Sequence, residues 1–140
     1  MNQSSSSIKI LNQNDILIFK NELLELYDPE NIRADKYFAW LQMSTYVVTA
    51  FSEKSIVGAI RILSDKFMVA LFFDLYVHPQ YRKQWIWSNL VSKAIDICKQ
   101  NSIKNIELIA DPRDKWLEQF YQSLWFTTSE DNGTYFSFKN

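Results

Sequence analysis

The fold is decided by residues 73–90, which read FDLYVHPQYRKQWIWSNL. Residues 67–77 form an almost continuous apolar run, which is typical of a strand buried on both faces, and Asp74 is its one interruption. Beyond Pro79 the hydrophobic period changes from that of a strand to that of a helix. The apolar residues at helical spacing are Ile86, Leu90, Val91, Ala94, Ile95 and Cys98. This stretch therefore predicts a strand, a loop and a helix in succession.

The residues on either side of this stretch predict a mixture of helices and strands. The elements expected before it are an edge strand at 8–11, helices at 15–27 (with Asn14 as N-cap) and 35–43, and strands at 45–51 and 56–63. Those expected after it are a strand at 103–110, a helix at 113–124 and a hairpin of 126–128 with 134–138 around Asn132-Gly133. The order β-α-α-β-β-β-α-β-α-β-β, with one strand returning through a helix, predicts the α+β class, or α/β in looser terms.

The length and composition predict one folded domain. A chain of 140 residues with 47% hydrophobic and 22% charged residues is long enough to bury a single core. We expect residues 1–7, with their serine run, to be a disordered lead-in and residues 8–140 to be a single domain. The formal net charge of -1 argues against a nucleic-acid or membrane-surface protein, which usually has a basic face.

Two further features bear on the cellular compartment. No apolar run approaches the roughly 20 residues that span a bilayer, and the first residues lack the basic and apolar regions of a secretory signal. The lone Cys98 lies in an apolar helical stretch, where we expect an inert core thiol in a reducing environment. The expected localisation is cytoplasmic.

Glycine and tryptophan occur in unusual numbers. The chain has 2 glycines, where an average chain of this length has about 10. It also has 5 tryptophans. The positions of three of them, Trp85, Trp87 and Trp125, connect the two anomalies.

Residues 82–87 open the predicted helix, where backbone N–H groups favour the binding of an anion. With its flanking strand and helix, this segment resembles the acyl-CoA-binding motif of small bacterial GNAT-family N-acetyltransferases, Arg/Gln-x-x-Gly-x-Gly/Ala. In that family the glycines let the backbone approach the coenzyme A pyrophosphate, because any Cβ would stand in between. The resemblance implies a mixed, mostly antiparallel central sheet of about seven strands flanked by four helices. It implies acetyl-CoA as cosubstrate, no metal, and the binding residues Leu75, Tyr76, Val77, Arg82, Lys83, Gln84, Trp85, Ile86, Trp87 and Ser88.

A second similarity lies in residues 114–126, which read DKWLEQFYQSLWF. They resemble the family pattern Asn-x-x-Ala-x-x-Phe-Tyr-x-x-x-Gly-Phe, although Asp114 and Leu117 depart from it. The resemblance implies that Tyr121 lies near the cofactor sulfur and protonates the departing thiolate, and that Asp114 contacts the cofactor. The alternative for Tyr121 is an aromatic side chain that packs on a helix face.

The proton acceptor is the least determined part of the predicted site. Asp74 lies on the cofactor strand inside an apolar run, where burial would make its carboxylate a stronger base. The alternative is a carboxylate satisfied by backbone amides. Glu107 is a weaker candidate, and we expect His78, at a strand end, to be structural. We expect Arg61 and the Ser64-Asp65 turn to lie in solvent rather than to face a substrate.

Trp85 and Trp87 occupy the positions of the motif's two glycines, and Trp125 replaces the glycine that ends the last helix of the pattern. A helix often ends on a left-handed residue, where a Cβ costs on the order of 1 kcal/mol. Three explanations stay open. In the first, UGA codons that encode glycine, as in some bacterial lineages, were translated as tryptophan. In the second, the chain is a pseudoenzyme whose coenzyme A cleft is plugged by indoles. In the third, it is a deliberate mutant.

The resemblance, to a branch related to arylalkylamine acetyltransferases, covers residues 40 to 128. It implies transfer of an acetyl group to a primary amine of a small molecule or peptide, by direct attack in a ternary complex. The alternative is a catalytically dead binding module of the same fold, whose coenzyme A cleft is blocked by Trp85 and Trp87. No nucleic-acid or membrane partner is expected, and a homodimer is compatible with the sequence.

Overall fold

The structure is a computed structural model that describes residues 6–82, 84–109, 113, 115–127 and 138. The chain divides into two units, Met1–Ile109 and Ala110–Asn140. The larger unit contains the sheet, and the smaller contains one described helix, α5 (Lys115–Ser123). The single domain expected over residues 8–140 stays a prediction.

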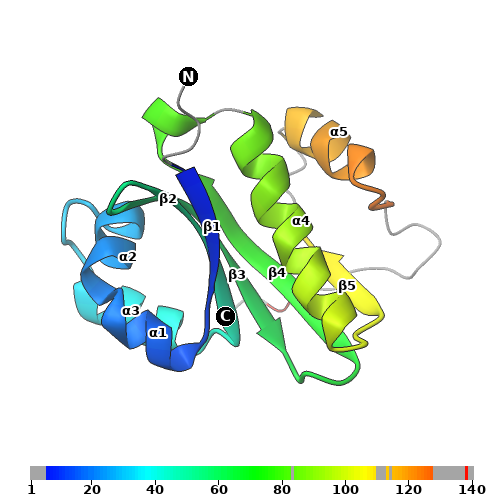
Figure 1. Cartoon of the computed structure of the whole chain (residues 1–140), viewed down its shortest axis with the longest axis horizontal. Coiled ribbons are helices and arrows are strands. Elements are labelled where there is room, and N and C mark those ends of the chain that lie inside the picture. Colours follow the sequence, from blue (N-terminus) through cyan, green and yellow to red (C-terminus); the bar gives the residue numbers. More distant parts are fainter. Residues whose placement is uncertain (1–5, 83, 110–112, 114, 128–137, 139–140) are drawn as a thin grey trace. The chain divides into compact units, whose positions relative to one another are not determined.

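The described part of Met1–Ile109 forms five strands and four α-helices (Figure 1). The strands are β1 (Ser6–Leu11), β2 (Tyr46–Ser52), β3 (Ser55–Ser64), β4 (Val69–Val77) and β5 (Asn105–Leu108). The helices are α1 (Gln13–Ile18), α2 (Lys20–Tyr27), α3 (Ala34–Gln42) and α4 (Gln84–Gln100). A short 3-10 turn, Pro79–Tyr81, lies between β4 and α4.

The strands form one mixed sheet in the order β1-β2-β3-β4-β5. Neighbours from β1 to β4 are antiparallel, whereas β5 pairs parallel to β4. Parallel neighbours need a crossover connection, and α4 supplies it (Figure 1). The predicted α+β fold with a mostly antiparallel sheet is confirmed, and so is the position of the first strand at the sheet edge.

The number of elements differs in detail from the prediction. The described residues form five strands instead of about seven, and most of the predicted hairpin of 126–128 with 134–138 lies outside them. They form five α-helices instead of four, because the predicted helix at 15–27 is interrupted at Phe19, where φ is -99° and ψ is 23°. The predicted strand at 103–110 is shorter than expected, since only Asn105–Leu108 pairs with β4.

The start of α1 is fixed by Asn12 and not, as predicted, by Asn14. The Asn12 side chain accepts the N–H of Asp15 at 2.9 Å, and the Asp15 carboxylate accepts the N–H of Asn12 at 3.1 Å. This reciprocal pair is a capping box, which satisfies two N–H groups that the first helical turn cannot satisfy itself.

The two faces of the sheet pack against different helices. Because side chains alternate along a strand, one face of β1–β3 turns towards α1–α3 and the other towards α4. The buried cluster on the first face contains Leu11, Ile16, Leu23, Leu26, Leu41, Val47, Phe51, Ile56 and Ala59. Figure 1 shows α1, α2 and α3 gathered on one side of the sheet and α4 crossing the other.

Gly58 marks a close approach between β3, β4 and α4. A Cβ at this position would lie 3.1 Å from Cγ2 of Val77 and 3.2 Å from Cδ1 of Leu90. These separations are shorter than ordinary packing contacts, so a side chain would push one of its neighbours away. The glycine therefore lets the end of β4 and the body of α4 pack on the same part of β3.

A bulge interrupts β4 at the one acidic residue of its apolar run. Asp74 and Leu75 together stand opposite the single residue Ile60 of β3. Asp74 has a left-handed φ of 57°, which aspartate tolerates better than most residues. β5 pairs only with residues 69–72, so residues 75–77 have no β5 neighbour. The bulge thus marks the point at which the sheet opens between its last two strands.

The prediction that β4 is buried on both faces is wrong. Buried and partly exposed residues alternate along it, and Asp74 is exposed. The exposure at residues 74–76 has a structural reason, since these three residues line a pocket.

Candidate functional site

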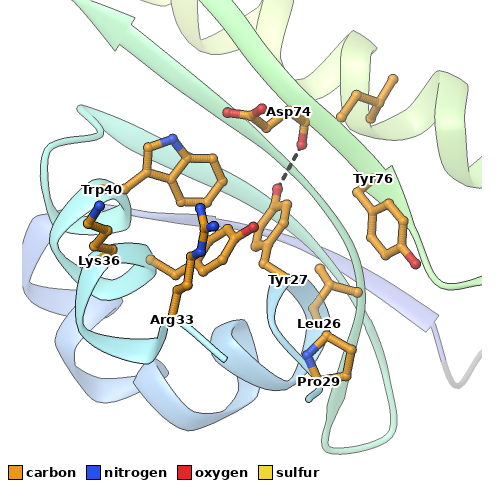
Figure 2. A pocket seen from close by; sticks show the side chains of 10 residues that line it. Leu26, Tyr27, Pro29, Arg33, Lys36, Trp40, Asp74 and Tyr76 are labelled. Atoms are coloured by element: carbon orange, nitrogen blue, oxygen red, sulfur yellow. Dashed lines mark hydrogen bonds between the residues drawn. The ribbon is translucent and has the colours of Figure 1, made fainter. Parts of the chain in front are cut away.

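A pocket of about 780 Å³ opens beside the β4 bulge (Figure 2). One wall comes from the end of α2, the following loop and α3, and the other comes from β4. The lining residues are Leu26, Tyr27, Pro29, Arg33, Lys36, Tyr37, Trp40, Asp74, Leu75 and Tyr76. All of them belong to the unit Met1–Ile109.

Arg61 of β3 is buried behind this pocket, and its guanidinium is engaged on several sides. Nη1 donates to Oδ2 of Asp74 at 2.8 Å, and Nε donates to the Ser44 hydroxyl at 2.8 Å. Nη2 donates to the Trp40 carbonyl at 3.1 Å, and the guanidinium carbon lies 4.1 Å from the centre of the Trp40 ring. The expectation that Arg61 lies in solvent is wrong, because the residue is only 5% exposed.

Asp74 is held at two points. Its carboxylate pairs with Arg61, and its backbone carbonyl accepts the hydroxyl of Tyr27 at 2.8 Å (Figure 2). The expected burial of this side chain is wrong, since it is 40% exposed at the pocket. A charged partner, and not backbone amides, satisfies the carboxylate. Both contacts stabilise the left-handed conformation on which the bulge depends.

Tyr27 is kept as a neutral hydrogen-bond donor by its surroundings. Burial raises the pKa of Tyr27 far above the ordinary value, and the negative charge of Asp74 raises it further, while Arg61 opposes the rise. The hydroxyl therefore stays protonated at physiological pH and donates to the Asp74 carbonyl. This hydrogen bond joins the two walls of the pocket, and within the helical wall the Tyr27 ring packs edge-on against Trp40, at 5.2 Å between ring centres.

The end of β4 offers a backbone edge beyond the bulge. The His78 N–H donates to the Val57 carbonyl at 2.7 Å. Antiparallel partners alternate between bonded and non-bonded pairs, so the preceding Val77 N–H points away from β3, towards the side on which β5 has ended. The Val77 carbonyl accepts Nε of Arg82 at 2.8 Å. Tyr76 differs from Val77, because its side chain lines the pocket on the opposite face.

The predicted cofactor loop leads into the first turns of α4. Ile86 is 2% exposed, so its side chain belongs to the core and only its backbone can face a ligand. Ser88 donates its hydroxyl to the Trp85 carbonyl at 3.3 Å, within the helix. Lys83 and the side chain of Gln84 lie outside the described residues.

The described backbone fits an acyl-CoA cradle, whereas two side chains on it do not. An open strand edge is followed by a helix start, which is the arrangement that favours a pyrophosphate. Trp85 and Trp87 both lie within α4 in helical conformation, so the fold itself does not require glycine at these positions. If the predicted coenzyme A site is correct, glycine is required here by the ligand alone, because a Cβ would stand between the backbone and the phosphate.

At Trp125, by contrast, the fold itself favours glycine. Trp125 has a φ of 73° directly after α5. Its N–H donates to the Gln122 carbonyl at 3.1 Å, and the Phe126 N–H donates to the Tyr121 carbonyl at 3.1 Å. These two bonds form a Schellman motif, in which the left-handed position is usually glycine. The predicted left-handed exit of the last helix is confirmed.

Tyr121 is buried in the described part of the smaller unit. Its ring centre lies 5.3 Å from that of Phe120 and 5.9 Å from that of Phe126. Burial raises the pKa of Tyr121 to about 12, so the phenol is protonated at neutral pH. Its role as proton donor to a thiolate stays a prediction. Asp114, the other cofactor residue predicted in this segment, lies outside the described residues.

The remaining candidates have structural surroundings. Nδ1 of His78 accepts the Gln80 N–H at 3.2 Å and thereby caps the 3-10 turn, as expected for a structural histidine. Glu107 is exposed on β5. Cys98 is 1% exposed, and burial raises its pKa to about 11, which agrees with an inert core thiol. Among the described residues, no three histidine, cysteine or acidic side chains gather in a way that could hold a metal ion.

Sequence reasoning missed the pocket-forming residues Tyr27 and Trp40 and the burial of Arg61. One signal was present, since Arg61 and Asp74 are opposite charges that each stand in an otherwise apolar strand. A buried charge needs a partner, so the two could have been paired. Nothing in the local sequence marks Tyr27 or Trp40 as pocket residues.

Comparison with known proteins gives consistent results. The sequence matches the acetyltransferase (GNAT) family over residues 16–126. It is 36% identical to the chloroplastic GCN5-related N-acetyltransferase 2 of Arabidopsis thaliana over 74 residues, which are 53% of this chain and 28% of that protein. The chain therefore spans less than a third of the length of this curated relative.

Solved structures resemble the fold over nearly its whole length. A GNAT-family acetyltransferase of Streptococcus pneumoniae matches with a TM-score of 0.76 at 23% identity, covering 96% of this chain and 98% of the other. An aminoglycoside acetyltransferase from an uncultured soil metagenomic sample, in complex with trehalose, also matches with a TM-score of 0.76, at 21% identity, covering 99% and 98%. At these identities the likeness concerns the fold. In the described part of this chain, no helix is long and apolar enough to cross a membrane.

Proposed function

The chain belongs to the GNAT acetyltransferase family, and from this premise we propose that it transfers an acetyl group from acetyl-CoA to a primary amine of a small molecule or peptide. The observation that carries the proposal is the opening of the sheet at the Asp74 bulge. Beyond it, residues 75–77 offer a backbone edge for the acyl donor, and the adjoining pocket offers space for the acceptor.

The chemistry needs few groups from the protein. The neutral amine attacks the thioester carbonyl carbon, a C–N bond forms and the C–S bond breaks. The nitrogen loses one proton and the departing sulfur gains one. Holding the amine and the thioester together supplies a large part of the acceleration in such a transfer. The Val77 N–H, directed away from β3, is positioned to polarise the thioester carbonyl.

The proton transfers are assigned to two residues and solvent. Tyr121 supplies the proton to the sulfur, in keeping with its protonated state at neutral pH. Asp74 or a chain of water molecules takes the proton from the amine. Since Oδ2 of Asp74 is occupied by Arg61, this carboxylate acts through its other oxygen or only positions Arg61 and the bulge.

An Asp74→Asn substitution distinguishes the two roles of Asp74 when it is made in a chain with glycine at positions 85, 87 and 125 and compared with that parent. The amide keeps an acceptor oxygen for Arg61, so the bulge is preserved while the proton acceptor is lost. A general base contributes about 10²–10⁴-fold to the rate. A fall of kcat in this range, with its pH dependence lost, identifies Asp74 as the base. A fall below about threefold assigns the proton to water.

Binding of acetyl-CoA tests the proposal itself. Thermal unfolding is measured with and without acetyl-CoA for the given chain and for a Trp85→Gly/Trp87→Gly/Trp125→Gly variant. A ligand at 100-fold excess over its Kd stabilises a protein by about 2.7 kcal/mol. We expect a shift for the variant and none for the chain with tryptophan. A variant that neither binds acetyl-CoA nor releases free thiol with any amine of a broad panel would refute the transferase.

A second candidate function is favoured by the indoles of Trp85 and Trp87 in the first turns of α4. A chain that truly carries them is a non-catalytic module whose coenzyme A cleft is blocked. The codons of the gene decide between the explanations. UGG codons at positions 85, 87 and 125 would mean that the tryptophans are real, whereas UGA codons would mean that glycine codons were read as tryptophan. The cytoplasmic localisation and the homodimer stay predictions.

A further inference from the structure

The charged residues of the pocket point to a class of acceptor. Three of the lining residues are charged: Arg33, Lys36 and Asp74. The negative charge of Asp74 is already compensated by Arg61, at 2.8 Å, whose guanidinium is buried behind the wall. The described residues give neither the Arg33 nor the Lys36 side chain an ion pair. The charges left for a ligand are therefore positive.

The acids nearest in sequence to these two residues do not line the pocket. The Asp28 carboxylate accepts the backbone N–H groups of Ile32 and Arg33 at 3.1 Å each, and so fixes the loop that carries Arg33. Glu30 and Asp35 are exposed, and both are absent from the lining. Figure 2 shows Arg33 and Lys36 on the α3 side of the pocket and Asp74 and Tyr76 on the strand side.

The rest of the lining is apolar and aromatic. Leu26, Pro29 and Leu75 contribute aliphatic surface, and four aromatic residues contribute the remainder: Tyr27, Tyr37, Trp40 and Tyr76. Tyr37 packs edge-on against Trp40 at 5.4 Å, and Tyr27 does so at 5.2 Å, which fixes the rings as walls. A ligand that fills this space buries an apolar body between the rings and presents its charge to the cations of α3.

We propose that the acceptor is an amine that also carries an anionic group, a carboxylate or a phosphate, on an apolar or aromatic body. Arg33 and Lys36 bind the anionic group, the aromatic walls hold the body, and the amine lies at the β4 bulge. A polycationic aminoglycoside would place several positive charges beside two cations that no carboxylate of the described residues compensates. The pocket therefore selects against the acceptor class of the structural relative from soil.

This inference rests on the proposed function, because it names the acceptor of that reaction. Binding is measured separately from turnover so that the two can fail independently. The chain is titrated by calorimetry with matched pairs that differ in one group: phenylalanine against phenethylamine, and O-phosphoethanolamine against ethanolamine, with kanamycin as the polycation. The glycine-restored variant is then assayed for thiol release with the same amines.

Both Arg33 and Lys36 are exposed, so each charge contributes modestly and is screened by salt. We expect the anionic member of a pair to bind about tenfold more tightly than its neutral partner in low salt. An Arg33→Gln/Lys36→Gln variant should lose this preference, and Lys36→Glu should shift it towards kanamycin. The matched control is Lys54→Gln, which removes one exposed charge at the β2–β3 turn and should leave the preference unchanged.

The outcomes separate the two proposals. Equal binding of the anionic and neutral members, or tighter binding of kanamycin, overturns the inference whatever the activity. A preference that survives in the double variant overturns it as well. If the anionic ligands bind preferentially but the restored variant neither binds acetyl-CoA nor turns over any amine, the acetyltransferase proposal fails while the ligand class stands.

Discussion

Replacing Trp125 by glycine should stabilise the protein, although the substitution removes a large indole side chain. The backbone at this position has a φ of 73°, where a Cβ costs an L-residue about 1–2 kcal/mol. Packing of the indole offsets little of this cost, because Trp125 is 93% exposed. Glycine in turn loses more conformational entropy on folding, which costs roughly 0.5–1 kcal/mol. The balance is a gain of about 0.5–1 kcal/mol, or roughly 2–4 °C in Tm for a chain of this size.

The assay is urea unfolding followed by circular dichroism at 222 nm, since fluorescence would change with the number of indoles. Trp125→Ala is the matched control: it removes the same indole but keeps the Cβ, so its stability should stay within about 0.3 kcal/mol of the parent. Hydrogen exchange of the Phe126 amide, which donates to the Tyr121 carbonyl, reports on the cap directly. If the glycine variant is no more stable than the alanine variant, the left-handed strain inferred at Trp125 is absent.

Three other changes test the packing around the site. Gly58→Ala should cost about 1–3 kcal/mol in urea unfolding, because its Cβ would stand 3.2 Å from Leu90; an unchanged midpoint would contradict the close approach. Arg61→Met should cost roughly 2 kcal/mol, because it removes buried charged hydrogen bonds, and the loss should persist in 1 M salt. The raised pKa of Tyr27 contributes stability below about pH 10, which is lost as the unfolded phenol ionises at higher pH. The free energy of unfolding of Tyr27→Phe should therefore fall less between pH 9 and pH 11, by about 1 kcal/mol, and an equal fall in both proteins would contradict the burial.

The three tryptophans at expected glycine positions separate into two kinds. Trp85 and Trp87 lie within a regular helix, so they do not strain the backbone, and in the proposed function their cost falls on the ligand. Trp125 lies in a left-handed conformation, so its cost falls on the fold. Trp40, in contrast, is well packed, since it contacts Tyr27, Tyr37 and the guanidinium of Arg61. An indole is thus in keeping with its surroundings at position 40 and out of keeping with them at position 125.

The order of the elements could be predicted from the sequence because it depends on local patterns. The apolar runs, the helical period of α4 and the loop between them all lie within residues 67–98. The break at Phe19 was missed, because the apolar spacing of residues 15–27 continues through it. The capping box with Asp15 gave a local reason to prefer Asn12 as N-cap, and the prediction overlooked it.

The sequence by itself therefore determined the family motif, the mixed sheet and the left-handed end of α5, since each depends on residues close together in the chain. Only the tertiary structure decided the state of Asp74. Its partner Arg61 is 13 positions away and the hydroxyl of Tyr27 is 47 positions away, and no local pattern encodes such pairings. The exposure of Asp74, the pocket beside it and the positive charge left in that pocket all arise from these contacts, because they form only when α2, α3, β3 and β4 come together.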